Sequence, residues 1–228
     1  SARARERLAQ IEKTGTQEKE AYLKAGLSKD DFIQLVRERA EQEKLPFISA
    51  VYQVFDEFLA KELAATGVTL ACQKGCCVCC KSTLLTCTEP EIDVLIRFIN
   101  SLPWQKRIPL VKKIKGYLGE WREYYQKNQS ILEREPFLAF RDWRKPCAFL
   151  DEAGECGIYP VRIMDCRNYT SLIICSSEMS PQTPCDPYHP GPGRFRFQSE
   201  TWANNLVLEE EARRLNLPRG EEGVVITM

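Results

Sequence analysis

The sequence predicts a mostly α-helical protein, in which a helical scaffold carries an irregular, cysteine-rich region with short β elements. Three observations lead to this fold class. Residues 1–70 contain no cysteine and few glycines or prolines, and their apolar residues recur at helical spacing. Five of the 11 cysteines fall between positions 72 and 80. From 134 to 195, proline, glycine, cysteine and aromatic residues concentrate and the helical period is lost.

The 228 residues suit one large domain or two small ones, and the sequence divides into three parts. These are a helical region at 1–70, a cysteine-cluster metal-binding domain at 71–195 with a helical insertion at 89–133, and a C-terminal helix and tail at 196–228. We expect the last part to pack on the same body. Basic and acidic residues balance at 32 each, so we expect neither a nucleic-acid nor a membrane partner.

The cellular setting follows from the cysteines and from the apolar runs. No run approaches the roughly 20 apolar residues that cross a bilayer, and no signal-like segment opens the chain. The odd number of cysteines prevents complete disulfide pairing, and adjacent cysteines are poor disulfide partners. We therefore expect a cytoplasmic protein that uses its thiols for metals, with allowance for a native N-terminus that this sequence, which starts at Ser1, lacks.

The first helices follow from caps and apolar spacing. Surface helices are predicted for Arg3–Lys13 and Gln17–Ala25. Ser28 is suited to cap the next helix, which has one apolar face. Another helix is expected from Pro46 to a stop at Gly67. The apolar faces are Phe32, Leu35 and Val36 for the earlier of these two helices and Phe47, Val51, Val54, Phe55, Phe58 and Leu59 for the later one.

Two helices are predicted between the cysteine groups. Thr88 and Glu91 form a capping-box pattern that opens the first. A second helix is expected from about Ser101–Pro103 toward Ile131, and the pair should fold back so that the two cysteine groups meet. The predicted buried face of the first helix is Ile92, Leu95, Ile96 and Ile99.

A last helix is expected to open at Ser199 or Thr201, and a short strand at Val224–Ile226. Its apolar residues should face inward and its run of three glutamates outward. The inward residues are Trp202, Leu206, Val207 and Leu208, and the outward ones Glu209, Glu210 and Glu211.

The first cysteine group reads C-Q-K-G-C-C-V-C-C. Thiols this close together bind a soft metal, bond to one another or carry redox chemistry. Gly75 allows the backbone to turn so that several thiols converge. The group comprises Cys72, Cys76, Cys77, Cys79 and Cys80.

The second group is spread singly along the chain at Cys147, Cys156 and Cys166, with Cys175 as the next candidate. A tight turn is predicted from Asp151 to Gly154, between two short strands that place cysteines at corresponding ends. The two groups together indicate a bipartite site.

The order of these motifs resembles a known family. The chain carries C-x3-C-x2-C-C, a helical insertion, P-C-x-F-L, C-x-I-Y and C-R. This order is similar to the CxxCxxCC zinc- or iron-chelating domain family, also called YkgJ-type cysteine-cluster proteins, over about residues 70 to 175. The matching positions are Cys72, Cys76, Cys79, Cys80, Cys147, Cys156 and Cys166, with Ile158, Tyr159, Arg162 and Arg167 around them.

The sequence departs from the family pattern in two places. Ile163 stands where the family often has proline, and Cys77 adds a thiol. A distantly similar relative with an assigned activity is flagellin lysine-N-methylase, which implies little about a substrate here. No glycine-rich fingerprint for a nucleotide-type cofactor accompanies the motifs.

The thiols suit an iron–sulfur cluster of the 4Fe-4S kind, or zinc. Iron–sulfur clusters accept scattered cysteines, whereas a structural zinc site prefers two close pairs, and only the first group supplies one. The candidate ligands exceed the needs of a single four-coordinate centre, so two centres, spare thiols or a reactive Cys77 remain open. They are Cys72, Cys76, Cys77, Cys79, Cys80, Cys147, Cys156, Cys166 and Cys175.

Other residues support weaker hypotheses. Arg162 and Arg167 are candidates for hydrogen bonds to a cofactor, and a structural salt bridge to Asp165 or Glu155 is the alternative. The sole histidine, His189, lies in a turn-rich stretch that favours a loop without a catalytic role. Cys87 and Cys185 are interpreted as spare thiols.

Two functions follow from these residues. The first is a metal-binding protein with an all-cysteine iron–sulfur or zinc centre that serves redox chemistry or substrate activation. The alternative is a zinc-binding structural, carrier or interaction module without turnover.

Overall fold

The computed structural model describes residues 28–67, 70, 72, 75–82, 87–134, 143, 145–168 and 198–216. Helices dominate this part of the chain, which confirms the helical scaffold. They are α2 (Lys29–Gln42), α3 (Phe47–Thr66), α4 (Val78–Ser82), α5 (Glu89–Ser101), α6 (Trp104–Arg134), the 3-10 turn η1 (Tyr159–Val161), α8 (Met164–Asn168) and α9 (Gln198–Arg214).

The predicted β elements have a single counterpart among the described residues. It is an antiparallel bridge between Leu150 and Cys156, and no strand forms there. The predicted helices Arg3–Lys13 and Gln17–Ala25 and the predicted strand Val224–Ile226 lie outside the described residues.

The ends of α2 and α3 agree with the sequence signals. The Ser28 hydroxyl accepts a hydrogen bond from the Asp31 amide at 3.0 Å, which satisfies one of the free donors at the start of α2. Pro46 precedes the first residue of α3, and Gly67 follows its last residue in the left-handed region, at φ 66°. Both predicted boundaries are confirmed.

The main core forms where α3 packs against α2, α9 and α5. Three aromatic rings meet at its centre: the Phe32 and Phe58 rings lie 5.0 Å apart, and Trp202 from α9 lies 5.9 Å from Phe32. The predicted inward face of α3 is confirmed for its larger part, because Val51, Val54, Phe55 and Phe58 are fully or almost fully buried. This core fixes the helices from which the cysteine region is held.

The buried face of α5 differs from the prediction. Leu95 is buried and Ile99 is half-buried as predicted, but Ile92 and Ile96 are 41% and 51% exposed, and Val94 is buried instead. The helix is rotated because Glu91 is directed into the interior, where four donors satisfy its carboxylate. The predicted capping box is present, and it is this same Glu91 that closes it.

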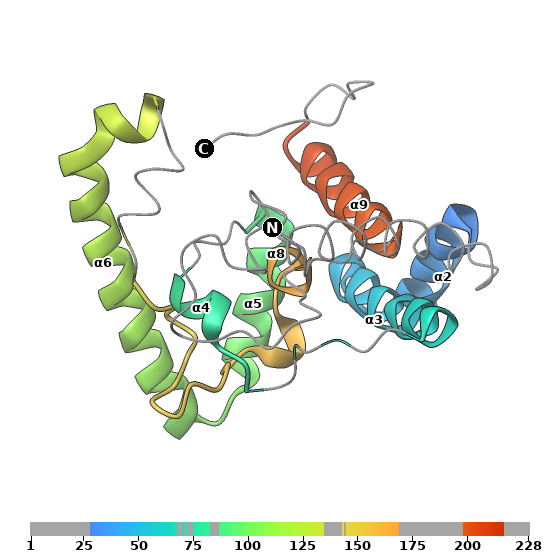
Figure 1. Cartoon of the computed structure of the whole chain (residues 1–228), viewed down its shortest axis with the longest axis horizontal. Helices are drawn as coiled ribbons and strands as arrows, with labels where there is room; N and C mark the ends of the chain where they lie inside the picture. Colours follow the sequence, from blue (N-terminus) through green and yellow to red (C-terminus); the bar gives the residue numbers. More distant parts are fainter. Residues whose placement is uncertain are drawn as a thin grey trace, which may run out of the picture.

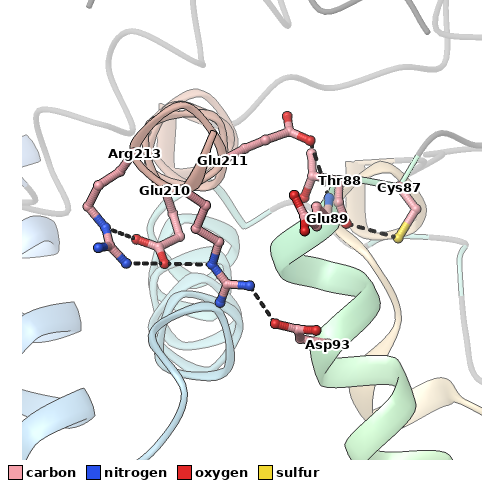
Figure 2. A network of polar contacts seen from close by, with 8 residues as sticks. Cys87, Thr88, Glu89, Asp93, Glu210, Glu211 and Arg213 are labelled. Atoms are coloured by element: carbon pink, nitrogen blue, oxygen red, sulfur yellow. Dashed lines mark hydrogen bonds and ion pairs between the residues drawn. The ribbon is translucent and has the colours of Figure 1, made fainter. Parts of the chain in front are cut away.

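The predicted outward glutamates of α9 are also corrected. Glu210 and Glu211 are buried against α5, and only Glu209 faces outward. Figure 2 shows the reason: Glu210 pairs with arginines of the last turn, and the Glu211 carboxylate accepts from the Glu89 amide at the start of α5 at 3.2 Å. Arg214 adds to the contact between α9 and α5 by pairing with both Glu210 and Asp93. The arginines hold the pKa of Glu210 below its usual value through hydrogen bonds.

A second, smaller apolar cluster lies where α5 meets the cysteine region. Leu95, Ile158 and Ile163 are its buried members, and Cys156 and Cys166 pack against it. In Figure 1, α6 runs along the opposite side of the molecule from α2, α3 and α9, with α4, α5 and α8 between them. None of the described helices has the length and apolar character needed to traverse a lipid bilayer.

Candidate metal centre

A backbone hydrogen bond joins the two cysteine groups. The Cys147 amide donates to the Cys80 carbonyl at 2.7 Å. Cys79 and Cys80 belong to the short helix α4, which follows Gly75 in the left-handed region at φ 95°. The prediction that the α5–α6 insertion folds back and brings the groups together is therefore confirmed.

The second group is shaped by the predicted tight turn. The Asp151 amide donates to the Glu155 carbonyl at 2.9 Å, and the Asp151 carboxylate accepts from the Glu155 amide at 2.8 Å. Gly154 has φ 80°, which an L side chain rarely adopts. The turn returns the chain so that Cys156 pairs with Leu150 and comes back beside Cys147.

Four thiols from three stretches of chain influence one another electrostatically. Burial raises the pKa of Cys166 well above its usual value, and Cys147, Cys156 and Cys79 raise it further. Burial is likewise the main cause of the raised pKa values of Cys147 and Cys156, and Cys79 adds to both. We name this set, Cys79, Cys147, Cys156 and Cys166, the thiol cluster.

Cys79 connects the thiol cluster to the rest of the first group. Its hydrogen bond with the Cys80 thiol is the main cause of its raised pKa, followed by burial and by the charges of Cys80 and Cys72. Each cluster thiol thus favours its protonated form when only protein surrounds it. A cation would reverse that preference, since thiolates are the metal-binding species.

The remaining predicted ligands lie differently. The Cys77 sulfur is directed to the 151–154 turn, where it would lie 3.2 Å from a Cβ atom on Gly154. Cys76 is exposed. Cys87 lies at the start of α5, where burial, then Glu91, raises its pKa. Cys175, Cys185 and His189 lie outside the described residues.

The cluster is convergent without being closed. Among the described residues, no three Cys, His, Asp or Glu side chains are arranged to hold a metal ion as they stand. No disulfide joins the nine cysteines that the structure describes. Ligation would therefore need side-chain rotations that bring the sulfurs closer together.

The two predicted cofactor-binding arginines take different places. Arg162 stacks over the Tyr159 ring, with its guanidinium carbon 4.4 Å from the centroid, and its charge lowers the pKa of Cys156 and of Cys166 against the effect of burial. Its Nε atom is buried and has no hydrogen-bond acceptor among the described residues. A buried donor beside two thiols is the kind of group that would bond to a sulfur anion.

Arg167 is committed to the scaffold. Its Nη1 atom forms an ion pair with both carboxylate oxygens of Asp56 of α3, at 2.5 and 2.6 Å, and its Nε and Nη2 atoms donate to the carbonyls of Arg162 and Pro160. It also stacks over the Tyr52 ring at 4.5 Å. The sequence indicates a salt bridge as one option for Arg167, but it does not single out Asp56 as the partner.

Sequence reasoning missed two groups that position the site. Asp56 and Tyr52 are one helical turn apart on α3 and both contact Arg167, next to Cys166. Glu91 accepts from the Met164 amide at 2.8 Å and so fixes the start of α8, which carries Cys166. The spacing of Tyr52 and Asp56 is the only signal in the sequence, and it is too common to identify them.

Searches of protein families, of curated proteins and of solved structures find no match to this chain. The resemblance to the YkgJ-type family accordingly remains a prediction that rests on the cysteine motifs.

Proposed function

We propose that the thiol cluster binds an all-cysteine metal centre, a 4Fe-4S iron–sulfur cluster in the leading form. The observation that carries the proposal is the convergence of Cys79, Cys147, Cys156 and Cys166. Each of these thiols either raises the pKa of another or has its own pKa raised by one. Four thiolates are the usual ligand set of such clusters. The motif resemblance to the YkgJ-type family supports the same chemistry.

Two features favour iron–sulfur over zinc. The cluster thiols come from separate stretches, whereas a structural zinc site prefers pairs from C-x2-C loops. The unpaired Nε donor of Arg162 also lies beside Cys156 and Cys166, where hydrogen bonds to sulfur would stabilise the negative charge of an iron–sulfur centre. When bound, the centre would supply electron transfer or a Lewis acid. The cluster thiols would hold it, and Arg162 would stabilise its negative charge.

A second candidate function is a closed zinc site that only orders the protein. It is favoured by the small size of the second apolar cluster, whose buried members among the described residues are Leu95, Ile158 and Ile163. Metal ligation commonly supplies the order that so small a core cannot. In either form thiolate ligands suit a reducing compartment, and we place the protein in the cytoplasm as part of the proposal.

Anaerobic purification with metal and sulfide analysis distinguishes the two forms. We expect a brown protein with iron and acid-labile sulfide; a colourless protein with zinc would support the second candidate. We further expect Cys79→Ser to lose most of the metal, because Cys79 is the thiol of the first group whose charge acts on Cys147, Cys156 and Cys166. Cys87→Ser is the matched control: Cys87 packs against the same apolar cluster as Cys156 and Cys166, but the charges that act on it are those of the carboxylates Glu91, Asp165 and Glu211. Equal metal content in the two variants would overturn the role of Cys79.

Metal binding should compete with protons. Because the folded protein raises the pKa values of the cluster thiols, each thiol must lose a proton when it binds metal at neutral pH. The apparent affinity for metal should therefore fall about tenfold for each unit by which the pH is lowered, for every such thiol. The stability of the metal-free protein should change in the opposite direction, falling as the pH rises. Its thiols have pKa values above those of the unfolded chain. The free energy of unfolding should therefore be highest below about pH 8.5, the pKa of a thiol in the unfolded chain, and should decline as the pH rises above that value.

Urea unfolding at pH 7 and pH 9.5, with and without chelator, measures both effects. The metal-free protein should lose stability at the higher pH, and the metal-loaded protein should not. A metal-free protein that is equally stable at both values would contradict the burial of neutral thiols.

A further inference from the structure

A cleft of about 500 Å³ lies beside the two cysteine groups. One wall is the middle of α6, with Lys113, Gly116 and Tyr117; the other is the 145–154 segment, and Lys81 of α4 contributes to the lining. The volume is in the range of small-molecule sites. Lys81 directly follows Cys80, and Lys145 and Pro146 directly precede Cys147, so the cleft borders the thiol cluster without including its sulfurs.

Three separate elements each contribute one ammonium group to the cleft. Lys145 is neutralised by Glu120, with the two charged groups 3.0 Å apart. The Lys113 ammonium donates to the Leu150 carbonyl, which uses one of its three donors and none of its charge. Among the described residues, no carboxylate lies within ion-pair distance of Lys81 or Lys113.

Three carboxylates also line the cleft, and of these Asp151 and Glu152 keep their charge. Glu120 serves Lys145, and the Asp151 carboxylate accepts from the Glu155 amide within the turn. Glu152 lies exposed on the same turn. Within the part of the chain that the structure describes, Lys81 and Lys113 are therefore the lysines of the cleft that no carboxylate pairs.

The rest of the lining is apolar or free of side-chain bulk: Tyr117, Pro146, Leu150, Ala153, Gly116 and Gly154. Tyr117 is held in place by Trp143, whose indole N–H donates to its hydroxyl oxygen at 3.1 Å. Two lysine ammonium groups and an apolar lining match a ligand with an anionic head and an apolar body.

We infer that this cleft binds a small organic anion, a carboxylate or phosphate ester with an apolar body, whose charged end is held by Lys81 and Lys113. The cleft places a ligand directly beside Cys80 and Cys147, which is where a substrate of the proposed centre would have to lie.

Four probes test the inference on the full chain by isothermal titration calorimetry. Benzoate and phenyl phosphate carry both parts of the proposed ligand, benzamide lacks the charge and inorganic phosphate lacks the apolar body. We expect saturable binding of at least one of the first two and weaker binding of the last two; the comparison of carboxylate with phosphate identifies the head group. Backbone amide signals of Gly116 and Gly154 should shift on titration with the tighter probe.

Lys113→Met should weaken the tighter probe about tenfold, the usual effect of one lost charge-assisted hydrogen bond. Lys112→Met is the matched control, because Lys112 is exposed on the same helix and does not line the cleft. Lys81→Gln should repeat the loss from another element if Lys113→Met disturbs folding. Metal content is measured in every variant, so a failure of the metal proposal is seen separately.

Three results would overturn the inference. They are the absence of saturable binding of both charged aromatic probes, benzamide binding as tightly as benzoate, and an equal loss in Lys112→Met and Lys113→Met. Inorganic phosphate binding as tightly as phenyl phosphate would overturn the apolar part of it.

Discussion

Glu91→Ala is expected to destabilise the protein by about 4 kcal/mol, the upper range for a single substitution. The Glu91 carboxylate is almost fully buried, and one oxygen accepts from the Tyr52 hydroxyl at 2.9 Å and the Met164 amide at 2.8 Å. The other oxygen accepts from the amide and the hydroxyl of Thr88. Alanine would leave several buried donors without an acceptor, and each costs about 1–3 kcal/mol. Urea unfolding of metal-free protein measures the change.

Glu89→Ala is the matched control, because the Glu89 side chain is exposed at the same helix end and the bond it makes with Glu211 uses its backbone amide. We expect it to cost less than about 1 kcal/mol through the lost interaction with the helix dipole. Glu91→Gln should fall between the two, since one side of an amide is a donor and would face donors whichever way it turned. A loss below about 1 kcal/mol for Glu91→Ala would contradict the role of this residue as a buried acceptor.

Asp56→Ala should destabilise the protein by about 3 kcal/mol, because it leaves a buried cation without its counter-charge. The Arg167 side chain is 2% exposed, whereas Asp56 is 52% exposed. Removing the exposed partner is therefore the more informative change, since it tests the cation without creating a cavity. Arg167 would keep the carbonyls of Pro160 and Arg162, which limits the loss. Thermal and urea unfolding both measure it.

Glu57→Ala provides the comparison on the adjacent residue of α3. Glu57 pairs with Arg39 at 2.7 Å, and both side chains are accessible to solvent. Ion pairs of this kind contribute at most about 1 kcal/mol. Equal losses in Asp56→Ala and Glu57→Ala would show that the burial of Arg167 has no energetic consequence.

The predictions that held were those decided by residues close in sequence. The Ser28 cap, the Gly67 stop and the Thr88–Glu91 capping box each depend on contacts within a few positions, and all are present. The sequence also predicts the meeting of the two cysteine groups, because the pair of helices between them is expected to fold back. It is seen in the hydrogen bond between Cys147 and Cys80.

The predictions that failed were those in which a distant donor outweighed hydrophobic periodicity. The pattern of α5 assigns Ile92 and Ile96 to the core, yet Glu91 enters it because Tyr52 and Met164 supply donors from elsewhere in the chain. Glu210 and Glu211 are buried for a similar reason: α5 offers a free amide, and nearby arginines offer charge. Periodicity measures apolar character and carries no information about such partners.

The same limit applies to the thiols. Motif spacing identified the cysteines that could contribute, but adjacent residues face different ways, and the direction of each side chain depends on the fold around it. Cys79 acts electrostatically on Cys147, Cys156 and Cys166, whereas the sulfur of Cys77, which stands two positions before Cys79, is directed to Gly154. Cys77, the additional thiol of the first group, therefore lies beside the 151–154 turn.

The hydrogen bond between Cys80 and Cys147 fixes both ends of the intervening segment, which makes the length of that segment thermodynamically unimportant. The entropy lost on closing a loop grows only with the logarithm of its length, so doubling it costs about 0.6 kcal/mol. Residues at the tip between α5 and α6 could therefore be added or removed at little cost to the meeting of the thiols, whereas the start of α5 could not be exchanged, because Glu91 and Val94 are buried there.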